Sequence, residues 1–455
     1  MAVIYSDHDQ RLGMVGRAMQ YFFFTVLNAI LFIRPGDLVE SLEPLQLYQL
    51  AILACLATTY PQVLAQFDSQ ALSRRPMTVC VIGLLAAIVL SQLQFGSIYD
   101  ARTSGFDFAK ILLYFLLLLI NLDTPAKFQK FLTSIVIFTV IAAGLALAQY
   151  HQIVDIPALA AYEQREVDEE TGEIIVFSRL CGAGIFNDPN DVCLLLMFTL
   201  MICLYRFLKP GAGPSRFVWL APALLFLVTF LETKSRGGFI GLMVALNVLI
   251  ISRIGFRKAI PLWIVAAPAV LVVFGGRMTR IEVDGGTGQH RIQLWREALG
   301  LLRDHPLFGV GQGMLPEYTR LVAHNSYVHA FAELGVFGGT LFVGAFYLAF
   351  TELRKLRTRP ELTPDSEFQR LRPYLLGILA GYATGILTLS RVYIVPTYLM
   401  LGLAAAYLEI ARAREPARHS VFAVVDGRLF GRLAGVGLAS LASLEIGSRL
   451  MVHWE

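Results

Sequence analysis

Arginines and a histidine recur in the polar stretches of this sequence, and together they have the side chains needed to bind a phosphate and accept a proton. A guanidinium group can donate two parallel hydrogen bonds to the oxygens of one phosphate, and it stays positively charged. Segment 275–326 is therefore a candidate anion-binding segment, with a solvated basic surface as the alternative for any single arginine. Its arginines are Arg277, Arg280, Arg291, Arg296, Arg303 and Arg320.

His324 begins the polar stretch His324-Asn325-Ser-Tyr, which runs directly into an apolar segment. Histidine has an ordinary pKa near ~6.5, so it can act as a base at neutral pH, and neighbouring arginines favour its neutral form. A capping or interfacial histidine is the alternative. His329 and Glu333 lie four residues apart, and without a third ligand we expect a polar core pair rather than a metal site.

Residues 289–302 are predicted to form a helix, because apolar residues recur there at steps of three and four. Arg291 stands at its expected start, where unpaired N–H groups and the helix dipole attract anions, and Arg296 lies on the same helix. The glycine-rich stretch 305–313 follows. We expect it to serve turns and packing, because its glycine spacing does not fit a dinucleotide fingerprint.

Two further arginines stand at the entrances of apolar segments. Arg236 lies in Ser235-Arg-Gly-Gly238, and Arg391 lies in a short turn. Each is a candidate ligand for an anion, and a side chain that reaches the lipid head groups is the alternative. The Asn187-Asp-Pro-Asn-Asp191 run is expected to cap a helix with Pro189 in its first turn, in preference to supplying a catalytic carboxylate.

The amino-acid composition indicates the kind of secondary structure that positions these residues. Of 455 residues, 56% are apolar and only 16% are charged, against about 25% charged in soluble domains. Continuous apolar runs of this length indicate membrane helices. We predict an all-α polytopic membrane protein with about twelve spans, near 18–33, 44–64, 76–94, 106–121, 128–150, 191–208, 216–231, 236–252, 258–274, 327–351, 374–390 and 392–410.

The distribution of Lys and Arg predicts the orientation, since short basic connections stay in the cytoplasm. Both termini are then cytoplasmic, and the long loops 151–190 and 275–326 lie outside. We predict one membrane domain over 1–410 and a cytoplasmic or interfacial tail over 411–455, with an amphipathic helix in 421–450 as the preferred alternative to a further span.

Net charge and cysteine content exclude several other classes. The formal charge of +4 comes from 38 basic and 34 acidic residues, without the basic stripe of a nucleic-acid binder. The five cysteines form no CxxC pair and are expected to be buried small hydrophobes. No metal site and no cofactor is predicted.

An ordered set of motifs resembles the O-antigen ligase and polymerase superfamily of bacterial envelopes. These motifs are Ser235-Arg-Gly-Gly238, His290-Arg-Ile-Gln-Leu-Trp295, His305-Pro-Leu-Phe-Gly-Val-Gly-Gln-Gly313, and His324-Asn-Ser-Tyr327 with Glu333-Leu-Gly-Val-Phe-Gly338. The resemblance implies a metal-independent, inverting glycosyltransferase of the inner membrane, with a GT-C-like fold and a periplasmic active site. It makes His324 the catalytic base and Arg236 and Arg291 the pyrophosphate ligands, with Asn325, Arg296 and Arg391 as possible supporting residues.

The resemblance also implies the partners. The donor is a glycan on undecaprenyl pyrophosphate, and the acceptor is a hydroxyl of a lipid A core or of another glycan, within the membrane lipids. A ligase, a repeat-unit polymerase and a protein O-glycosylating enzyme share these motifs, and the ligase is the preferred interpretation. A lipid-linked glycan transporter is less favoured, because the charged residues gather at one membrane face rather than at mid-membrane depth.

Overall fold

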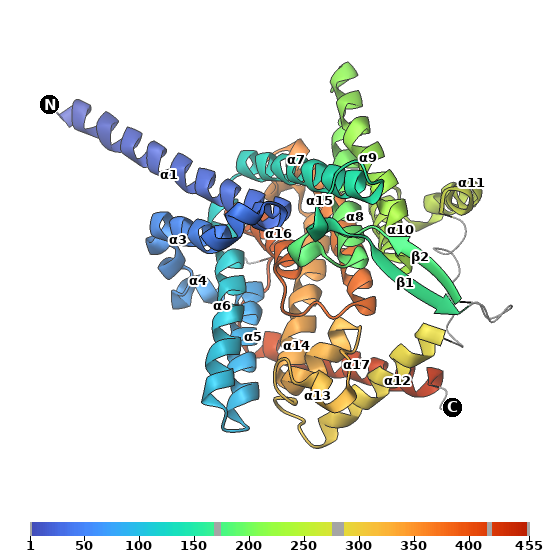
Figure 1. The fold of residues 1–455 in the computed structure, drawn as a ribbon. Coiled ribbons are helices and arrows are strands. Elements are labelled where there is room, and N and C mark those ends of the chain that lie inside the picture. The colour runs from blue at the N-terminus through green and yellow to red at the C-terminus, as the bar shows by residue number, and fades with distance from the viewer. Residues whose placement is uncertain (1, 168–173, 275–285, 416–420, 453–455) are drawn as a thin grey trace. The chain divides into compact units, whose positions relative to one another are not determined.

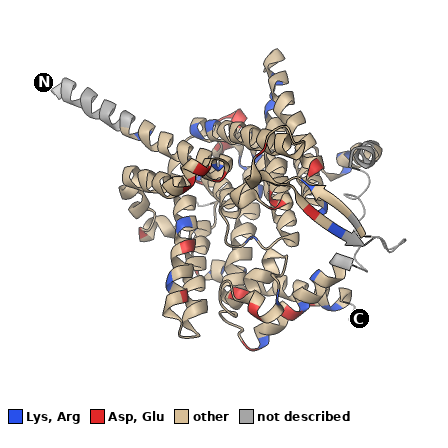
Figure 2. Ribbon diagram, viewed as in Figure 1, with Lys and Arg blue, Asp and Glu red and all other residues tan. Residues whose placement is uncertain are grey.

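A computed structural model describes residues 2–167, 174–274, 286–415 and 421–452. It consists of long helices and, within these residues, one two-stranded hairpin (Figure 1). Uncharged residues make up most of the long helices (Figure 2). The predicted all-α membrane fold is confirmed. The chain divides into a first unit, residues 1–64 and 120–239, and a second unit, residues 65–119 and 240–455.

The first unit is built around three packed helices, α7, α8 and α9, with α1 against α7. Thr124 caps α7 by accepting a hydrogen bond from Lys127 N at 3.3 Å. Asp188 caps α8, and Pro189 takes its first position, as the sequence predicts. The elements are α1 (Ala2–Ile33), α2 (Pro35–Leu38), α3 (Leu47–Ala65), α7 (Pro125–Tyr150), β1 (Tyr162–Val167), β2 (Ile174–Arg179), α8 (Pro189–Phe207), α9 (Leu220–Glu232) and the start of α10 (Arg236–Ile254).

The hairpin was missing from the sequence prediction. Its strands are antiparallel, with Tyr162 opposite Arg179 and Val167 opposite Ile174. The run Ile174-Ile-Val-Phe177 has the β-branched and aromatic residues that favour strands. The hairpin lies within the predicted loop 151–190, of which residues 168–173 are outside the described residues.

The second unit is organised around α14, which packs against α5, α12, α15, α16 and α17. Asn325 caps α14, and Asp365 caps α15 through Phe368 N at 2.6 Å. The elements are α4 (Ser69–Ser73), α5 (Pro76–Leu93), α6 (Ile98–Asn121), the rest of α10, α11 (Phe256–Phe274), α12 (Gly286–Gly300), α13 (Leu315–Thr319), α14 (Ser326–Lys355), α15 (Ser366–Gly385), α16 (Val395–Arg412) and α17 (Gly427–Met451).

Ten helical segments of the described chain are long and apolar enough to cross a membrane. Nine of them coincide with predicted spans. The other three predicted spans form α11, α15 and α16, which are not among the ten. In α15 the charged residues Glu367, Arg370 and Arg372 occupy the first two turns, and the α-helix ends at Gly385.

The tenth candidate span is α17, where the sequence favoured an interfacial helix in a cytoplasmic tail. In the segment just before α17, Ala423 N donates to Glu352 Oε2 of α14 at 2.9 Å. Further along, Gly437 packs against Thr340 of α14. At its end, Gln289 Nε2 of α12 donates to Met451 O at 2.8 Å. The first half of α17 thus packs against α14 and its second half against α12. Its length and apolar composition make it a candidate span.

We expect the two ends of α17 to lie on opposite sides of the membrane. Alkaline phosphatase is active only outside the cytoplasm, so a fusion after Glu455 and a fusion after Arg359, in the connection that follows α14, should give opposite results. Fluorescent-protein fusions at the same two positions should show the reverse pattern. If both positions report the same compartment, α17 does not cross.

Candidate functional site

Arg236 is the first residue of α10, the position at the entrance of an apolar helix that the sequence predicts. Ser235 caps this helix, because its Oγ accepts a hydrogen bond from Gly238 N at 3.0 Å. The same Oγ donates to Asn190 Oδ1, at the start of α8, at 2.6 Å. Ser235 therefore holds the first turn of α10, where Arg236 lies, and ties it to the start of α8.

Arg179, at the end of β2, fixes the turn that precedes Arg236. Its side chain is buried and donates from Nε to Thr233 O at 2.8 Å and from Nη2 to Asn190 Oδ1 at 2.9 Å. Lys234, in the same turn, adopts a positive φ of 49°. Sequence reasoning missed Arg179. The sequence did contain an indication of its burial. Arg179 ends a run rich in β-branched residues and is followed by Leu-Cys-Gly.

We expect Arg179→Gln to release the Arg236 turn and so to lower, at least tenfold, the glycan transfer that the sequence resemblance implies. Arg165→Gln is the matched control, because Arg165 lies on the same hairpin and is exposed. If Arg179 acts through Arg236, the double variant with Arg236→Gln should be no less active than Arg236→Gln alone. Additive losses in initial transfer rates would contradict this.

In the second unit, His324 and Asn325 form the turn that leads into α14. Asn325 Oδ1 accepts hydrogen bonds from Tyr327 N at 3.0 Å and Val328 N at 3.2 Å, so this side chain is the helix cap. His324 is partly buried and has a left-handed φ of 48°. Non-glycine residues hold this conformation only where their surroundings enforce it, and such residues cluster at functional sites.

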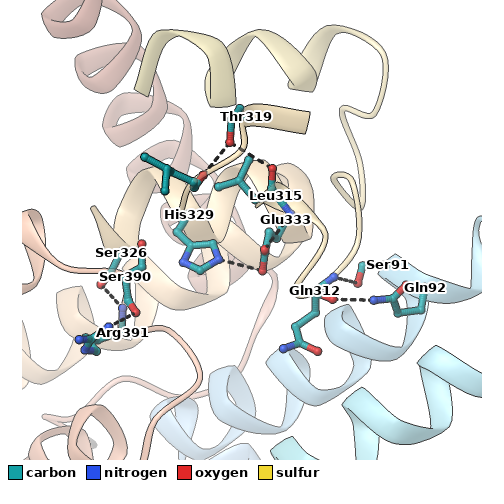
Figure 3. Close-up of polar contacts among 11 residues, drawn as sticks. Ser91, Gln92, Gln312, Leu315, Thr319, Ser326, His329, Glu333, Ser390 and Arg391 are labelled. Atoms are coloured by element: carbon teal, nitrogen blue, oxygen red, sulfur yellow. Dashed lines mark hydrogen bonds and ion pairs between the residues drawn. The ribbon is translucent and has the colours of Figure 1, made fainter. Parts of the chain in front are cut away.

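Ser326 joins this turn to Arg391. Its Oγ accepts a hydrogen bond from Arg391 N at 2.8 Å (Figure 3). The same Oγ donates to Leu389 O at 2.6 Å. The structure therefore brings the backbone of Arg391 next to the His324-Asn325 motif, although 65 residues separate Arg391 from Ser326 in the sequence.

Arg291 and Arg296 lie on α12, the helix predicted over 289–302. Ile292 and Leu299 are buried, and Trp295 packs against the apolar cluster that contains Leu299, which confirms the predicted apolar face. The helix begins at Gly286, however, so Arg291 is its sixth residue and not at its start. The argument from the helix N-terminus therefore does not apply to Arg291. Arg296 forms an ion pair with Glu445 of α17.

The glycine-rich stretch 305–313 is bound to a break in α14 at Gly335, where φ is 65°. On one side of the break, Val310 N and Gly311 N donate to Ala332 O and Glu333 O at 2.9 and 3.0 Å. On the other side, Val336 N donates to Pro306 O at 2.9 Å. Backbone groups freed by the break are thus paired, as a membrane interior requires. The predicted turn and packing role is confirmed.

His329 and Glu333 form the buried polar pair that the sequence predicts, with Nε2 and Oε2 3.0 Å apart. Glu333 is fully buried, and its Oε1 accepts from Leu315 N at 3.2 Å. The ring of Tyr393 lies 5.6 Å from the imidazole. Through Glu333 the pair ties the start of α13 to α14 (Figure 3).

Metal and thiol chemistry have few candidates in the described residues. No group of three His, Cys, Asp or Glu side chains there could hold a metal ion. All five cysteines are free and buried, as expected. Burial raises the pKa of the Cys181 thiol to about 11, so this cysteine, which lies outside the spans, is not a thiolate nucleophile at neutral pH.

These features define a multi-pass membrane protein with arginines and a histidine at the polar ends of its helices. Residues 221–343 match the family model described as O-antigen ligase. The match confirms the resemblance seen in the sequence and supports a membrane enzyme of the O-antigen ligase or polymerase type. It includes Arg236, Arg291, Arg296, His324 and Asn325, whereas Arg391 lies beyond it. No curated protein matches the chain.

Proposed function

We propose that the protein is an inner-membrane glycosyltransferase that moves a glycan from undecaprenyl pyrophosphate to an acceptor hydroxyl on the periplasmic side, as an O-antigen ligase does. The observation that carries the proposal is the family match over 221–343, since the motifs with Arg236, Arg291 and His324 all fall within it. Lipid-linked glycan and acceptor are then the substrates.

In this mechanism His324 accepts the proton of the acceptor hydroxyl as its oxygen attacks the anomeric carbon. The bond from that carbon to the pyrophosphate oxygen breaks at the same time. Attack from the face opposite the leaving group inverts the configuration at this carbon. The pyrophosphate leaves with an additional negative charge on its oxygen.

Arg236 and Arg291 stabilise that developing charge. Guanidinium groups are permanently charged and offer two parallel donors to phosphate oxygens. Fixed cations of this kind lower the barrier most when they are held in place before the reaction. The cap at Ser235 and the bonds from Arg179 support this role for Arg236, because they fix the first turn of α10.

Purified protein should transfer glycan from a synthetic polyprenyl-pyrophosphate oligosaccharide to one member of a panel of lipid A core and glycan acceptors, in the presence of a chelator. Arg236→Lys and Arg291→Lys keep the charge but lose the paired donors, so each should lower transfer more than Arg165→Lys does. Undiminished transfer by both variants would remove these arginines from the mechanism.

A repeat-unit polymerase fits the same family match and uses a second lipid-linked glycan as acceptor. The lipids of a deletion strain separate the two activities. Loss of a ligase leaves long chains on the polyprenyl lipid, whereas loss of a polymerase leaves single repeat units. We expect long chains.

A further inference from the structure

A second polar region lies in the first unit, at the ends of α7 and α8 that are remote from Arg236. Here α1, α7 and α8 line a pocket of about 480 Å³, a size common for ligand sites. Its two charged residues are Lys130 and Arg206, and its other lining side chains are hydroxyls and one amide. The pocket is therefore positively charged and contains no carboxylate.

The guanidinium of Arg206 is held in place rather than extended into solvent. Its Nη2 donates to Gln129 O and to Thr133 Oγ1, both at 2.8 Å. The guanidinium carbon lies 5.6 Å from the ring centre of Trp219. A fixed guanidinium loses little entropy when it binds an anion, and tryptophan is typical of the membrane–water boundary.

A comparison with the neighbouring Lys127 shows how the surroundings of Lys130 differ. Lys127, one turn earlier on α7, forms an ion pair with Asp123 at 2.9 Å. Lys130 faces the pocket and is exposed. Lys127 therefore offers a matched comparison: the same residue type on the same helix end, with its charge already balanced.

The length of α7 indicates where the pocket lies across the membrane. From Lys130 to Tyr150 the helix runs twenty residues, or roughly 30 Å at its usual rise, which is about the thickness of the hydrocarbon core. Tyr150 lies at the far end, where its hydroxyl donates to O of Ser178, the residue before Arg179, at 3.3 Å. The pocket and the Arg236 turn are thus at opposite membrane faces.

An exposed apolar stripe leads from the pocket along α7. Ser134 lines the pocket, and Ile137 and Ile141 follow on the same helix face at steps of three and four. Their side chains are 53% and 41% exposed. A cationic pocket at the boundary with an apolar track toward the membrane centre fits a molecule that has both a phosphate and a hydrocarbon chain.

We propose that this pocket binds the phosphate-bearing head group of an anionic membrane lipid, with one of its chains along Ile137 and Ile141. Lys130 and Arg206 contact the phosphate. The site is separate from the proposed glycan transfer and does not depend on it.

The test is native mass spectrometry of the full chain in neutral detergent with phosphatidylglycerol, phosphatidylcholine or inorganic phosphate. Wild-type protein should retain phosphatidylglycerol in preference to phosphatidylcholine. Lys130→Gln should weaken that retention about fivefold, the effect of one basic residue near an anionic surface. Lys127→Gln should leave it unchanged. Ile137→Ser with Ile141→Ser should also weaken lipid retention, without touching the cations.

Three outcomes would overturn the proposal. Equal losses in Lys130→Gln and Lys127→Gln would reduce the effect to general surface charge. Equal retention of both lipids would remove the head-group specificity. Competition by inorganic phosphate as strong as that by phosphatidylglycerol, with no effect of the isoleucine changes, would make the pocket a phosphate site and not a lipid site.

Discussion

His324→Ala should lower glycan transfer by about 10²–10⁴-fold, the usual contribution of a positioned general base. The reason is that no other group in the proposed mechanism accepts the proton of the acceptor hydroxyl. The measurement is the initial rate of product formation by purified protein, with equal amounts of folded protein established by size-exclusion chromatography.

The left-handed backbone at His324 calls for a second variant. Alanine tolerates this conformation poorly, whereas asparagine adopts it more readily. His324→Asn should therefore keep the turn into α14 and still lose transfer. His151→Ala is the matched control, because His151 is exposed at the end of α7. Substantial transfer by His324→Asn would assign the proton to another group.

Features set by local sequence could be predicted. The caps of α8 and the apolar face of α12 follow from Asp188-Pro189 and from the spacing of Ile292, Trp295 and Leu299. The extension of α12 back through Gly286-Thr-Gly288 could not be predicted, since these residues disfavour a helix. There tertiary contacts such as that of Gln289 with Met451 add to local propensity.

Features set by distant partners were not predictable. Nothing near Gly335 shows that it, rather than Gly338 or Gly339, breaks α14, because the break is stabilised by backbone groups of residues 306–311. The packing of α17 on α14 and α12 is likewise invisible in hydropathy alone. Of the site, the sequence predicted His324 and Arg391 separately, and Ser326 joins their backbones. The common site of Arg236 with Arg291 and His324 stays a prediction.

Gly335→Ala should have the largest effect on stability, roughly 2–6 kcal/mol. The backbone there has φ 65° and ψ −167°, a combination that is essentially restricted to glycine and costs other residues about 1–3 kcal/mol. A Cβ at this position would lie 2.3 Å from the carbonyl carbon of Leu307, and relieving such overlap costs a further ~1–3 kcal/mol. Thermal unfolding of the purified protein in detergent is the measurement.

Gly144→Ala in α7 is the control, because nothing lies within 4 Å of its added Cβ, and alanine in an open helical position should stabilise by up to ~1 kcal/mol. Gly309→Ala then tests whether the glycine-rich stretch 305–313 and the break in α14 at Gly335 stabilise each other. Its Cβ would lie 2.4 Å from the carbonyl carbon of Glu333, so either change pushes the same two backbones apart. Once one has separated them, the second should cost only its own conformational strain. The double variant should therefore be destabilised by less than the sum of the single variants, whereas full additivity would mean that each glycine serves only its own local turn.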